Sequence, residues 1–359
     1  MTPPRSAFGA PPQGGRAGRG TVPADCSSPA SAGSVLAAGD ASGPAKPVPR
    51  RPFDRPPRRA LHGVLLLDKP LGLSSNDALQ QAKRLYRAQK AGHTGTLDPL
   101  ASGLLPLCFG AATKFAQLSL DADKRYLATL RLGVTTTTGD GEGQVLQQRE
   151  VALERAAIDT VIARFAGVIE QLPPMHSALK HAGRALYDYA RKGLEVERRP
   201  RRVTIHRIDI VDWQGQTLVL DVRCSKGTYI RTLAEDIGAL LGCGAHLSAL
   251  RRTASGALRV EDALTLDALA AMNEAERDAR LMPADALLAG WPRVQLPDDE
   301  AGRFLTGLRR RVALADAAAV RVYGPHDAFL GSAHITGGEL IADRLLSPTE
   351  VAGCSQSRK

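Results

Sequence analysis

Two alternating segments joined by a tight turn constrain the fold of this chain most. Residues 201–213 (RRVTIHRIDIVDW) and 217–227 (TLVLDVRCSKG) each alternate apolar and polar side chains, and Gly215 lies in the turn between them. This pattern is typical of an antiparallel strand pair with one buried face. Residues 124–134 (KRYLATLRLGV) alternate in the same way, and the apolar run Gly63–Asp68 predicts a buried strand.

Helical segments interrupt the strands at long intervals. One helix is predicted to begin at Ser74 or Ser75, because either hydroxyl can cap free backbone N–H groups before an amphipathic run. Two more are predicted over 152–167 and 228–242, each ended by a glycine. Strands and helices do not alternate regularly, and the sequence has no GxGxxG motif or P-loop. We therefore expect an α+β fold with a mixed, largely antiparallel sheet and flanking helices.

Composition divides the chain into four parts. Residues 1–60 are one-third Pro and Gly and carry +6 of the net charge of +10, so we expect a disordered tail. Residues 61–285 hold the strands and helices above and predict the main domain. Short strands and glycine turns over 286–350 predict a compact β-rich binding module, and 351–359 is expected to be a second disordered tail.

The remaining composition excludes several classes of protein. The five cysteines are widely spaced and no pair has CxxC spacing, so neither a disulfide framework nor a zinc site is indicated. No apolar stretch approaches the roughly 18 residues of a membrane span, and the N-terminus lacks a secretion signal. We expect a soluble, cytoplasmic protein. The mild basic charge outside the tail is compatible with a nucleic-acid partner but does not establish one.

The stretch AGHTGTLDPLASGLL (91–105) places one carboxylate, Asp98, between a glycine-rich turn and an apolar run. One interpretation is structural: Asp98 caps a turn before Pro99. The other is chemical and needs a nearby cation to keep the carboxylate ionised and an aromatic ring to shape a pocket. Arg231, Tyr229 and Tyr126 are the candidates.

Two points stay open from the residues alone. Tyr229 and Arg231 stand two positions apart, so their side chains would diverge on a helix and converge only if the backbone is extended or turned there. His93 is either an exposed loop residue or part of the site. No second ligand stands at metal-binding spacing around His93, and no nucleophile elbow predicts a Ser/His/Asp triad.

At this point five blocks carry a resemblance. They are, in order along the chain, LLLDKPLGLSSND, GHTGTLDPLASGLL, KRYLATLRLGVTTTTGD, PPMHSALKHAGRALYDYARKG and CSKGTYIRTLAEDIGALLGCGAHLSALRRT. With these blocks the chain resembles, over about residues 62–256, the TruB family of tRNA pseudouridine-55 synthases, and its C-terminal part more loosely resembles the family's PUA-like module.

The resemblance implies a pseudouridine-synthase fold and the isomerisation of uridine 55 in the T-loop of tRNA, with no cofactor and no metal. Asp98 would be the catalytic carboxylate, acting as a nucleophile or base, and Arg231 would pair with it. Tyr126 would stack on the target base, and Tyr229 would accept the C5 proton. Leu250 would complete the pocket wall.

The resemblance also implies contacts with the RNA. The target base must be flipped out of its stack, and His93 would fill the gap that it leaves. Lys69 belongs to the KPxGxSS turn and would support the pocket. The segment 176–193 would close over the RNA, with phosphate contacts from Lys180, Arg184, Arg191 and Lys192 and packing by Tyr187 and Tyr189. The competing interpretation of this segment is an ordinary amphipathic helix with a solvated basic face.

Two alternatives from other classes remain. One is an RNA-binding tRNA folding helper without essential catalysis; a carboxylate in a pocket for an anionic ligand argues against it. The other is a guide-dependent synthase, which would carry a longer, Lys-rich extension than residues 1–60 provide. We expect a monomer that binds the T-stem-loop of tRNA and has no membrane partner.

Overall fold

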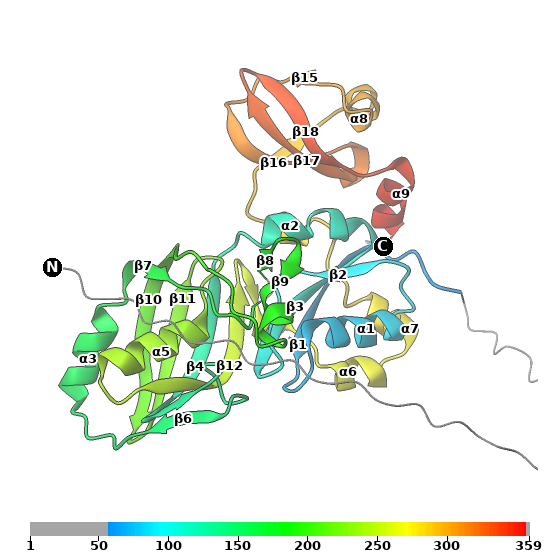
Figure 1. The fold of residues 1–359 in the computed structure, drawn as a ribbon. Coiled ribbons are helices and arrows are strands. Elements are labelled where there is room, and N and C mark those ends of the chain that lie inside the picture. Colours follow the sequence, from blue (N-terminus) through cyan, green and yellow to red (C-terminus); the bar gives the residue numbers. More distant parts are fainter. Residues whose placement is uncertain (1–56, 178, 357–359) are drawn as a thin grey trace, which may run out of the picture. The chain divides into compact units, whose positions relative to one another are not determined.

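The computed structural model describes residues 57–356 except Ala178, and of Gln356 only the backbone. A mixed sheet of nine strands forms its centre (Figure 1). All of its strand pairs are antiparallel except β12 with β3, so the α+β prediction is confirmed. Across the sheet the strands are β1 (Gly63–Lys69), β3 (Ala101–Phe109), β12 (Ala245–Ser255), β4 (Lys124–Leu132), β11 (Thr217–Cys224), β10 (Arg201–Gln214) and β7 (Gly167–Gln171), with β2 (Ala91–His93) on β3 and β13 (Leu258–Arg259) on β12.

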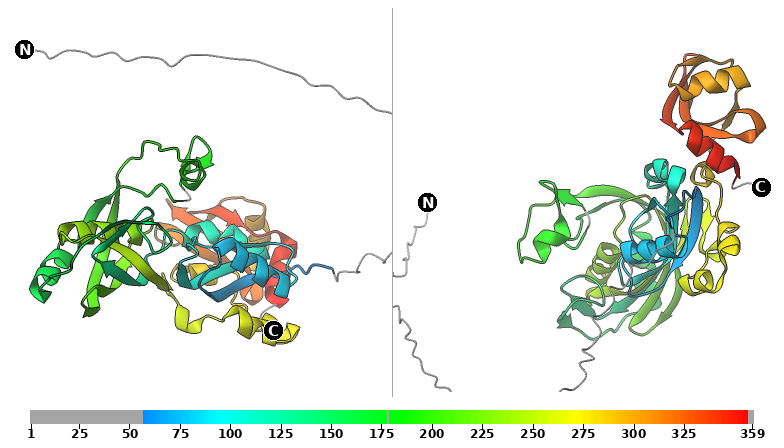
Figure 2. Two further views of the ribbon diagram at one scale, coloured as in Figure 1. Left: turned by 60° about the horizontal axis from the view of Figure 1, so that its bottom comes forward. Right: turned by 90° about the vertical axis from the view of Figure 1, so that its right-hand side faces the viewer.

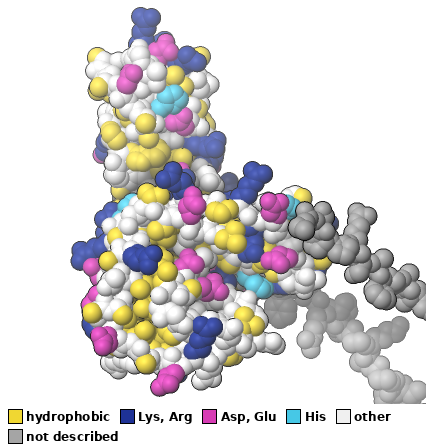
Figure 3. Space-filling model, turned by 60° about the vertical axis from the view of Figure 1, so that its left-hand side comes forward, with side chains coloured by type: hydrophobic (Ala, Val, Ile, Leu, Met, Phe, Trp, Pro, Cys, Tyr) yellow, Lys and Arg dark blue, Asp and Glu magenta, His cyan; other side chains and the backbone are white. Residues whose placement is uncertain are grey.

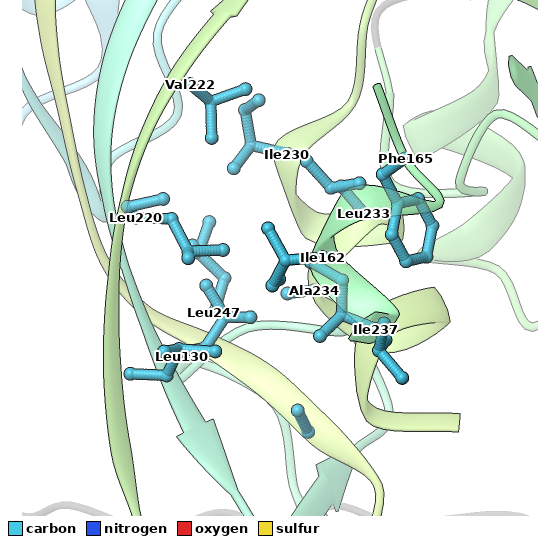
Figure 4. Packing of buried hydrophobic residues seen from close by; sticks show 14 of the residues in the cluster. Leu130, Ile162, Phe165, Leu220, Val222, Ile230, Leu233, Ala234, Ile237 and Leu247 are labelled. Atoms are coloured by element: carbon cyan, nitrogen blue, oxygen red, sulfur yellow. The ribbon is translucent and has the colours of Figure 1, made fainter. Parts of the chain in front are cut away.

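Two helices cover one face of the β4, β10, β11 and β12 half of the sheet. They are α5 (Ile230–Leu240) and α3 (Arg155–Ala163), and Figure 4 shows their apolar side chains against those of the strands. The alternation of β11 places Leu218, Leu220 and Val222 in this core, all fully buried. Truncating a buried leucine such as Leu233 to alanine would cost about 2–5 kcal/mol.

The β1 and β3 half of the sheet is covered on both faces. On one face pack α1 (Ser75–Leu85) and α6 (Leu266–Ala271). On the other lie the short helices η1 (Gly110–Lys114), α2 (Ala116–Ser119) and η3 (Ala286–Leu288). The short helix η2 (Val260–Asp262) precedes α6 in the chain, and α7 (Glu274–Asp278) follows it.

Most elements lie where the sequence predicts them. The hairpin of β10 and β11 turns at Gly215 (φ +55°), and Ser74 caps α1 by accepting a hydrogen bond from the Asp77 N–H. The helix predicted over 228–242 is α5, followed by Gly242 at φ +78°.

Three local predictions are wrong. The helix predicted through Gly167 ends at Ala163, because Gly167 (φ +97°) reverses the chain into β7 instead of ending the helix. The strand predicted over 124–134 is interrupted at Gly133 (φ +83°): β4 ends at Leu132, and Val134 begins strand β5 (Val134–Thr136), which pairs with β6 (Val145–Gln148). The competing interpretation of the segment 176–193 as one amphipathic helix is also wrong: the segment contains the ribbon of β8 (Lys180–His181) and β9 (Arg184–Ala185), followed by the short helix α4 (Leu186–Ala190). Figure 2 (left) shows it standing out from the sheet.

A second, five-stranded sheet forms the C-terminal module, and α9 (Pro348–Gln356) follows it. The disordered tail expected from 351 is therefore helical as far as Gln356, and 357–359 lie outside the described residues. Residues 1–56 of the expected N-terminal tail also lie outside the described residues. Arg59, in the last part of that expected tail, forms an ion pair with Asp278. The module consists of β14 (Arg293–Gln295), α8 (Asp298–Leu305), β15 (Arg310–Arg311), β16 (Ala317–Tyr323), η4 (Pro325–Asp327), β17 (Phe329–Thr336) and β18 (Glu339–Leu345).

Candidate active site

Asp98 lies in the connection from β2 to β3. Its carbonyl oxygen accepts a hydrogen bond from the Ala101 N–H at 3.0 Å, which closes a turn. The preceding residue, Leu97, is buried and is bound through both its N–H and its carbonyl to the Ser75 hydroxyl at the start of α1. The backbone that carries Asp98 is therefore fixed by a helix N-terminus, while 48% of the Asp98 side chain stays exposed.

Arg231 in the first turn of α5 meets this carboxylate. Its Nη2 lies 3.2 Å from Asp98 Oδ2, and its side chain is only 8% exposed. The same Nη2 donates to the His176 carbonyl at 2.5 Å. Arg231 therefore faces Asp98 as a buried cation at ion-pair distance. The structure brings together the two residues that the resemblance pairs.

A second carboxylate, Asp140, contacts the other side of Arg231. Asp140 Oδ2 lies 3.2 Å from Arg231 Nη1, and the residue is almost fully buried. Its Oδ1 accepts hydrogen bonds from the Thr138 hydroxyl (2.5 Å) and the Glu142 N–H (3.2 Å). Sequence reasoning assigned Asp140 no role, and the only signal would have been an acidic residue among the glycines of the loop TTTTGDGEG.

Tyr229 is the residue immediately before α5. Its backbone is extended (φ −97°, ψ 107°), so Tyr229 and Arg231 are not both on the helix and the divergence expected of helical i, i+2 positions does not apply. Gln171 holds this backbone with two hydrogen bonds, accepting from the Tyr229 N–H (3.0 Å) and donating to its carbonyl (3.2 Å). Burial raises the pKa of the Tyr229 hydroxyl, and the cations Arg201 and Arg231 oppose this rise.

Tyr126 and Leu250 lie on the adjoining part of the sheet. Leu250 on β12 is opposite Ala128, two residues along β4 from Tyr126. Both side chains are partly buried and pack against the two core clusters under α1 and α5. They therefore form an apolar wall at the junction of the two halves of the sheet, on the helix-covered face. Burial raises the pKa of Tyr126.

Lys69 and His93 lie at the ends of β1 and β2. Lys69 is fully buried and donates to the carbonyls of Pro70 (2.8 Å) and Leu73 (2.6 Å), so it fixes the turn before α1. Burial lowers the pKa of Lys69 to about 8, and Asp98 partly opposes the shift. Burial, followed by the charge of Arg252, lowers the pKa of His93, so its ring is neutral at pH 7.

Lys180 and Arg184 are exposed on the β8–β9 ribbon and do not contact Asp98. Nearby, the Arg191 guanidinium lies 5.2 Å from the Tyr187 ring centre, and the Tyr189 hydroxyl donates to the His181 carbonyl at 3.1 Å. The beginning of this segment does reach the site, through the His176 carbonyl on Arg231.

Metal ligation has no candidate in this part of the chain. No group of three or more His, Cys, Asp or Glu side chains within the described residues could hold an ion. The four described cysteines are free. No helix described between residues 57 and 356 is long and apolar enough to span a membrane.

Three family models match consecutive parts of the chain. The N-terminal domain of the TruB family pseudouridylate synthases matches residues 83–230, and the tRNA pseudouridylate synthase B C-terminal domain matches 231–289. The C-terminal model of pseudouridine synthase II TruB matches 292–346. Together they include Asp98, Tyr126, Tyr229, Arg231 and Leu250.

Individual proteins give the same result. The tRNA pseudouridine synthase B of Burkholderia mallei is 58% identical over 302 residues, 82% of this chain and 97% of that protein. The protein of the same name from Verminephrobacter eiseniae is 59% identical over 305 residues, 82% of this chain and 92% of that protein. In fold, the chain is similar to a solved Cbf5-Nop10-Gar1 complex (TM-score 0.62, 26% identity, 81% of this chain and 87% of that chain). The chain belongs to the TruB family of pseudouridylate synthases.

Proposed function

We propose that this protein isomerises uridine 55 in the T-loop of tRNA, with Asp98 as its catalytic carboxylate. Isomerisation of uridine to pseudouridine in tRNA is the activity of the family to which the chain belongs. The observation that supports Asp98 best is its environment: a half-exposed carboxylate held at 3.2 Å by an arginine that is otherwise buried. A carboxylate that only capped a turn would not need a buried cation.

The chemistry needs an ionised carboxylate next to the sugar–base bond. Asp98, paired with Arg231, acts as nucleophile or base while the bond between C1′ and N1 breaks and uracil leaves as an anion. The base turns and C5 bonds to C1′, which releases any bond formed between C1′ and Asp98. The Tyr229 hydroxyl takes the C5 proton as it gives up its own, and N1 gains one proton, so the number of protons is unchanged. No atom is lost, so the reaction is an isomerisation and requires no cofactor.

The surrounding residues suit the target base and its loop. The wall of Tyr126 and Leu250 offers a ring and an aliphatic side chain on which a flipped pyrimidine can stack, which offsets the few kcal/mol needed to extrude it. His93, neutral at pH 7, has an apolar ring face and can fill the gap left in the T-loop.

Phosphate contacts are assigned to the exposed ribbon of β8 and β9. Lys180 and Arg184 extend there into solvent. On the face shown in Figure 3, Lys and Arg side chains are scattered among Asp and Glu side chains and form no continuous basic surface. Local groups such as these two would bind phosphates of the T-stem-loop. We further propose that the protein acts as a monomer in the cytoplasm, where its substrate is found.

Release of tritium from tRNA transcripts labelled at uridine C5, with mapping of the product, tests the proposal. We expect wild type to release tritium from one T-loop uridine and Asp98→Asn to release none while its tRNA Kd stays within about three-fold, because the carboxylate acts in chemistry and not in docking. Asp77→Asn, at the exposed start of α1, is the matched control and should keep wild-type turnover. Substantial turnover by Asp98→Asn would remove Asp98 from the mechanism. A wild-type protein that binds tRNA without releasing tritium would favour the folding helper.

A further inference from the structure

Three buried cations near the candidate site have no carboxylate partner. Lys69, Lys124 and Arg252 are 0%, 8% and 1% exposed, and none forms an ion pair with any carboxylate in the described part of the chain. Backbone carbonyls bind them instead: Pro70 and Leu73 for Lys69, Leu120 and Ala122 for Lys124, and Leu104 and Gly95 for Arg252. A carboxylate would cancel each charge, whereas carbonyl dipoles stabilise it and leave the net charge in place.

Strand register brings these cations together. Lys69 on β1 is opposite Gly103 on β3, and Gly103 is opposite Arg252 on β12. Arg252 in turn is opposite Tyr126 on β4, and the Tyr126 hydroxyl is a hydrogen-bond partner of its guanidinium. Gly103 contributes no side chain to this row, and a Cβ there would lie 2.3 Å from the Arg252 carbonyl oxygen. Lys124 stands two residues before Tyr126, on the same face of β4.

Arg252 is the centre of this group, and its contacts lead to the site from two sides. Through the Gly95 carbonyl (3.1 Å) it holds the connection that carries Asp98, and through Tyr126 it holds the apolar wall. Its charge also acts at a distance, because it lowers the pKa of His93, Lys69 and Lys124 in addition to the larger effect of burial. The charge of Arg252, which no carboxylate neutralises, therefore acts on several positions around the proposed site of the target uracil.

We propose that Arg252 is a positioning residue that, with Lys69 and Lys124, maintains a positive potential beneath the target base and stabilises the uracil anion between bond cleavage and reattachment. This inference rests on the proposed function, because only that reaction forms an anion at this place. Fixed charges that need no reorganisation are the most effective way to stabilise charge that develops in a reaction. The buried arrangement excludes water and so strengthens the interaction.

The test compares Arg252→Met with Arg251→Met. Arg251 is the adjacent residue on the opposite face of β12, where it pairs with Asp68, so it controls for losing an arginine from the same strand. Under single-turnover conditions at saturating tRNA, we expect Arg252→Met to lower the rate on the order of 10- to 100-fold and Arg251→Met to leave it unchanged. Arg252→Lys, which restores the charge, should recover a large part of the loss.

An independent measurement reads the potential without the reaction. The pKa of His93, followed by NMR of the ring protons, should rise in Arg252→Met and stay unchanged in Arg251→Met. A folded Arg252→Met protein with the wild-type rate, or with an unshifted His93 pKa, overturns the proposal. If Arg252→Met does not fold, Lys124→Met takes its place, and a wild-type rate in that variant also overturns it. Absence of activity in wild type would refute the proposed function as well, while the His93 measurement would still show whether the potential exists.

Discussion

Asp98 and Arg231 are the residues that sequence reasoning could place, because each lies in a distinctive block. Sequence reasoning could not identify Asp140 and Gln171, for a physical reason. Each acts on Arg231 or Tyr229 through a hydrogen-bond geometry fixed by loop paths, and no periodicity of the sequence encodes those paths. The same holds for Arg252: its neighbour Arg251 has the same side chain, and only the strand register shows which of the two is buried.

The buried ammonium of Lys69 predicts a specific dependence of stability on pH. Its pKa is about 8 in the folded protein and 10.5 in the unfolded chain, so between these values the unfolded chain binds more protons at this position. The contribution of Lys69 to the free energy of unfolding therefore rises with pH in that range, by about 2 kcal/mol from pH 8 to 10. Lys124, with its pKa also lowered to about 8, adds a rise of the same sign.

Urea denaturation at a series of pH values measures this effect. We expect the free energy of unfolding of Lys69→Met to lack, relative to wild type, a rise of about 2 kcal/mol between pH 8 and 10, whatever its stability at pH 7. The exposed Lys192 provides the control variant, Lys192→Met, which should keep the full rise. The buried thiols of Cys108 and Cys224, whose pKa values are raised to about 12 and about 11, and tyrosines with raised pKa values lower the stability over part of the same range; all variants share these groups, so the difference from wild type removes their effect. An identical slope in wild type and Lys69→Met would contradict the buried charge.

Among the elements, the long strands and amphipathic helices could be predicted from sequence because burial repeats along them with period 2 or 3.6. The short pieces could not. Strand β2 has three residues and β7 lies at the sheet edge, so neither repeats a buried face often enough to be recognised. The ribbon of β8 and β9 exposes its charged residues on both strands, and its pairing depends on the turn at Gly183 (φ +83°).

The ribbon yields a prediction about RNA affinity. Replacing Lys180 and Arg184 together with alanine should weaken tRNA binding and lower the slope of log Kd against log salt by nearly two, because two phosphate contacts are lost. The single-turnover rate at saturating tRNA should remain close to wild type. Filter binding at several salt concentrations measures the slope. Replacing Arg155 and Arg207, which are exposed on other elements and paired with Asp159 and Asp209, is the matched control; an equal change in slope there would argue against a specific role for the ribbon.

At the scale of the whole chain, a shared apolar cluster joins the C-terminal module to the main domain. Phe115 packs against Phe329 with ring centres 5.2 Å apart, and Lys114 bridges to Glu350 on α9 at 2.5 Å. Asp285, just before the module, accepts a hydrogen bond from the Tyr323 hydroxyl. The sequence predicted a module of this size and composition but not its attachment, because Phe115 and Lys114 meet partners that are more than 200 positions away in the chain.

This cluster predicts a single cooperative unfolding transition for both parts. Phe115→Ala should lower the free energy of unfolding by about 3–5 kcal/mol, because it opens a cavity at a fully buried ring. It should also split the transition, since the contact that couples the module is lost. Scanning calorimetry measures both effects, and Leu308→Ala, at an exposed position in the module, should change neither. One unsplit transition in Phe115→Ala would show that other contacts couple the parts.

Arg231 Nη2 contacts two groups at once: it donates a hydrogen bond to the His176 carbonyl at the beginning of the ribbon segment, and it forms an ion pair with the Asp98 carboxylate. A displacement of that segment would therefore change the contact that Arg231 Nη2 makes with Asp98. If the protein acts on tRNA as proposed, RNA that displaces the ribbon would therefore also change the contact between Arg231 and Asp98, whereas a free nucleoside, too short to reach the ribbon, would leave that contact as it is. Comparing the turnover of the two substrates separates the reactivity of Asp98 itself from the effect of RNA contact at the ribbon.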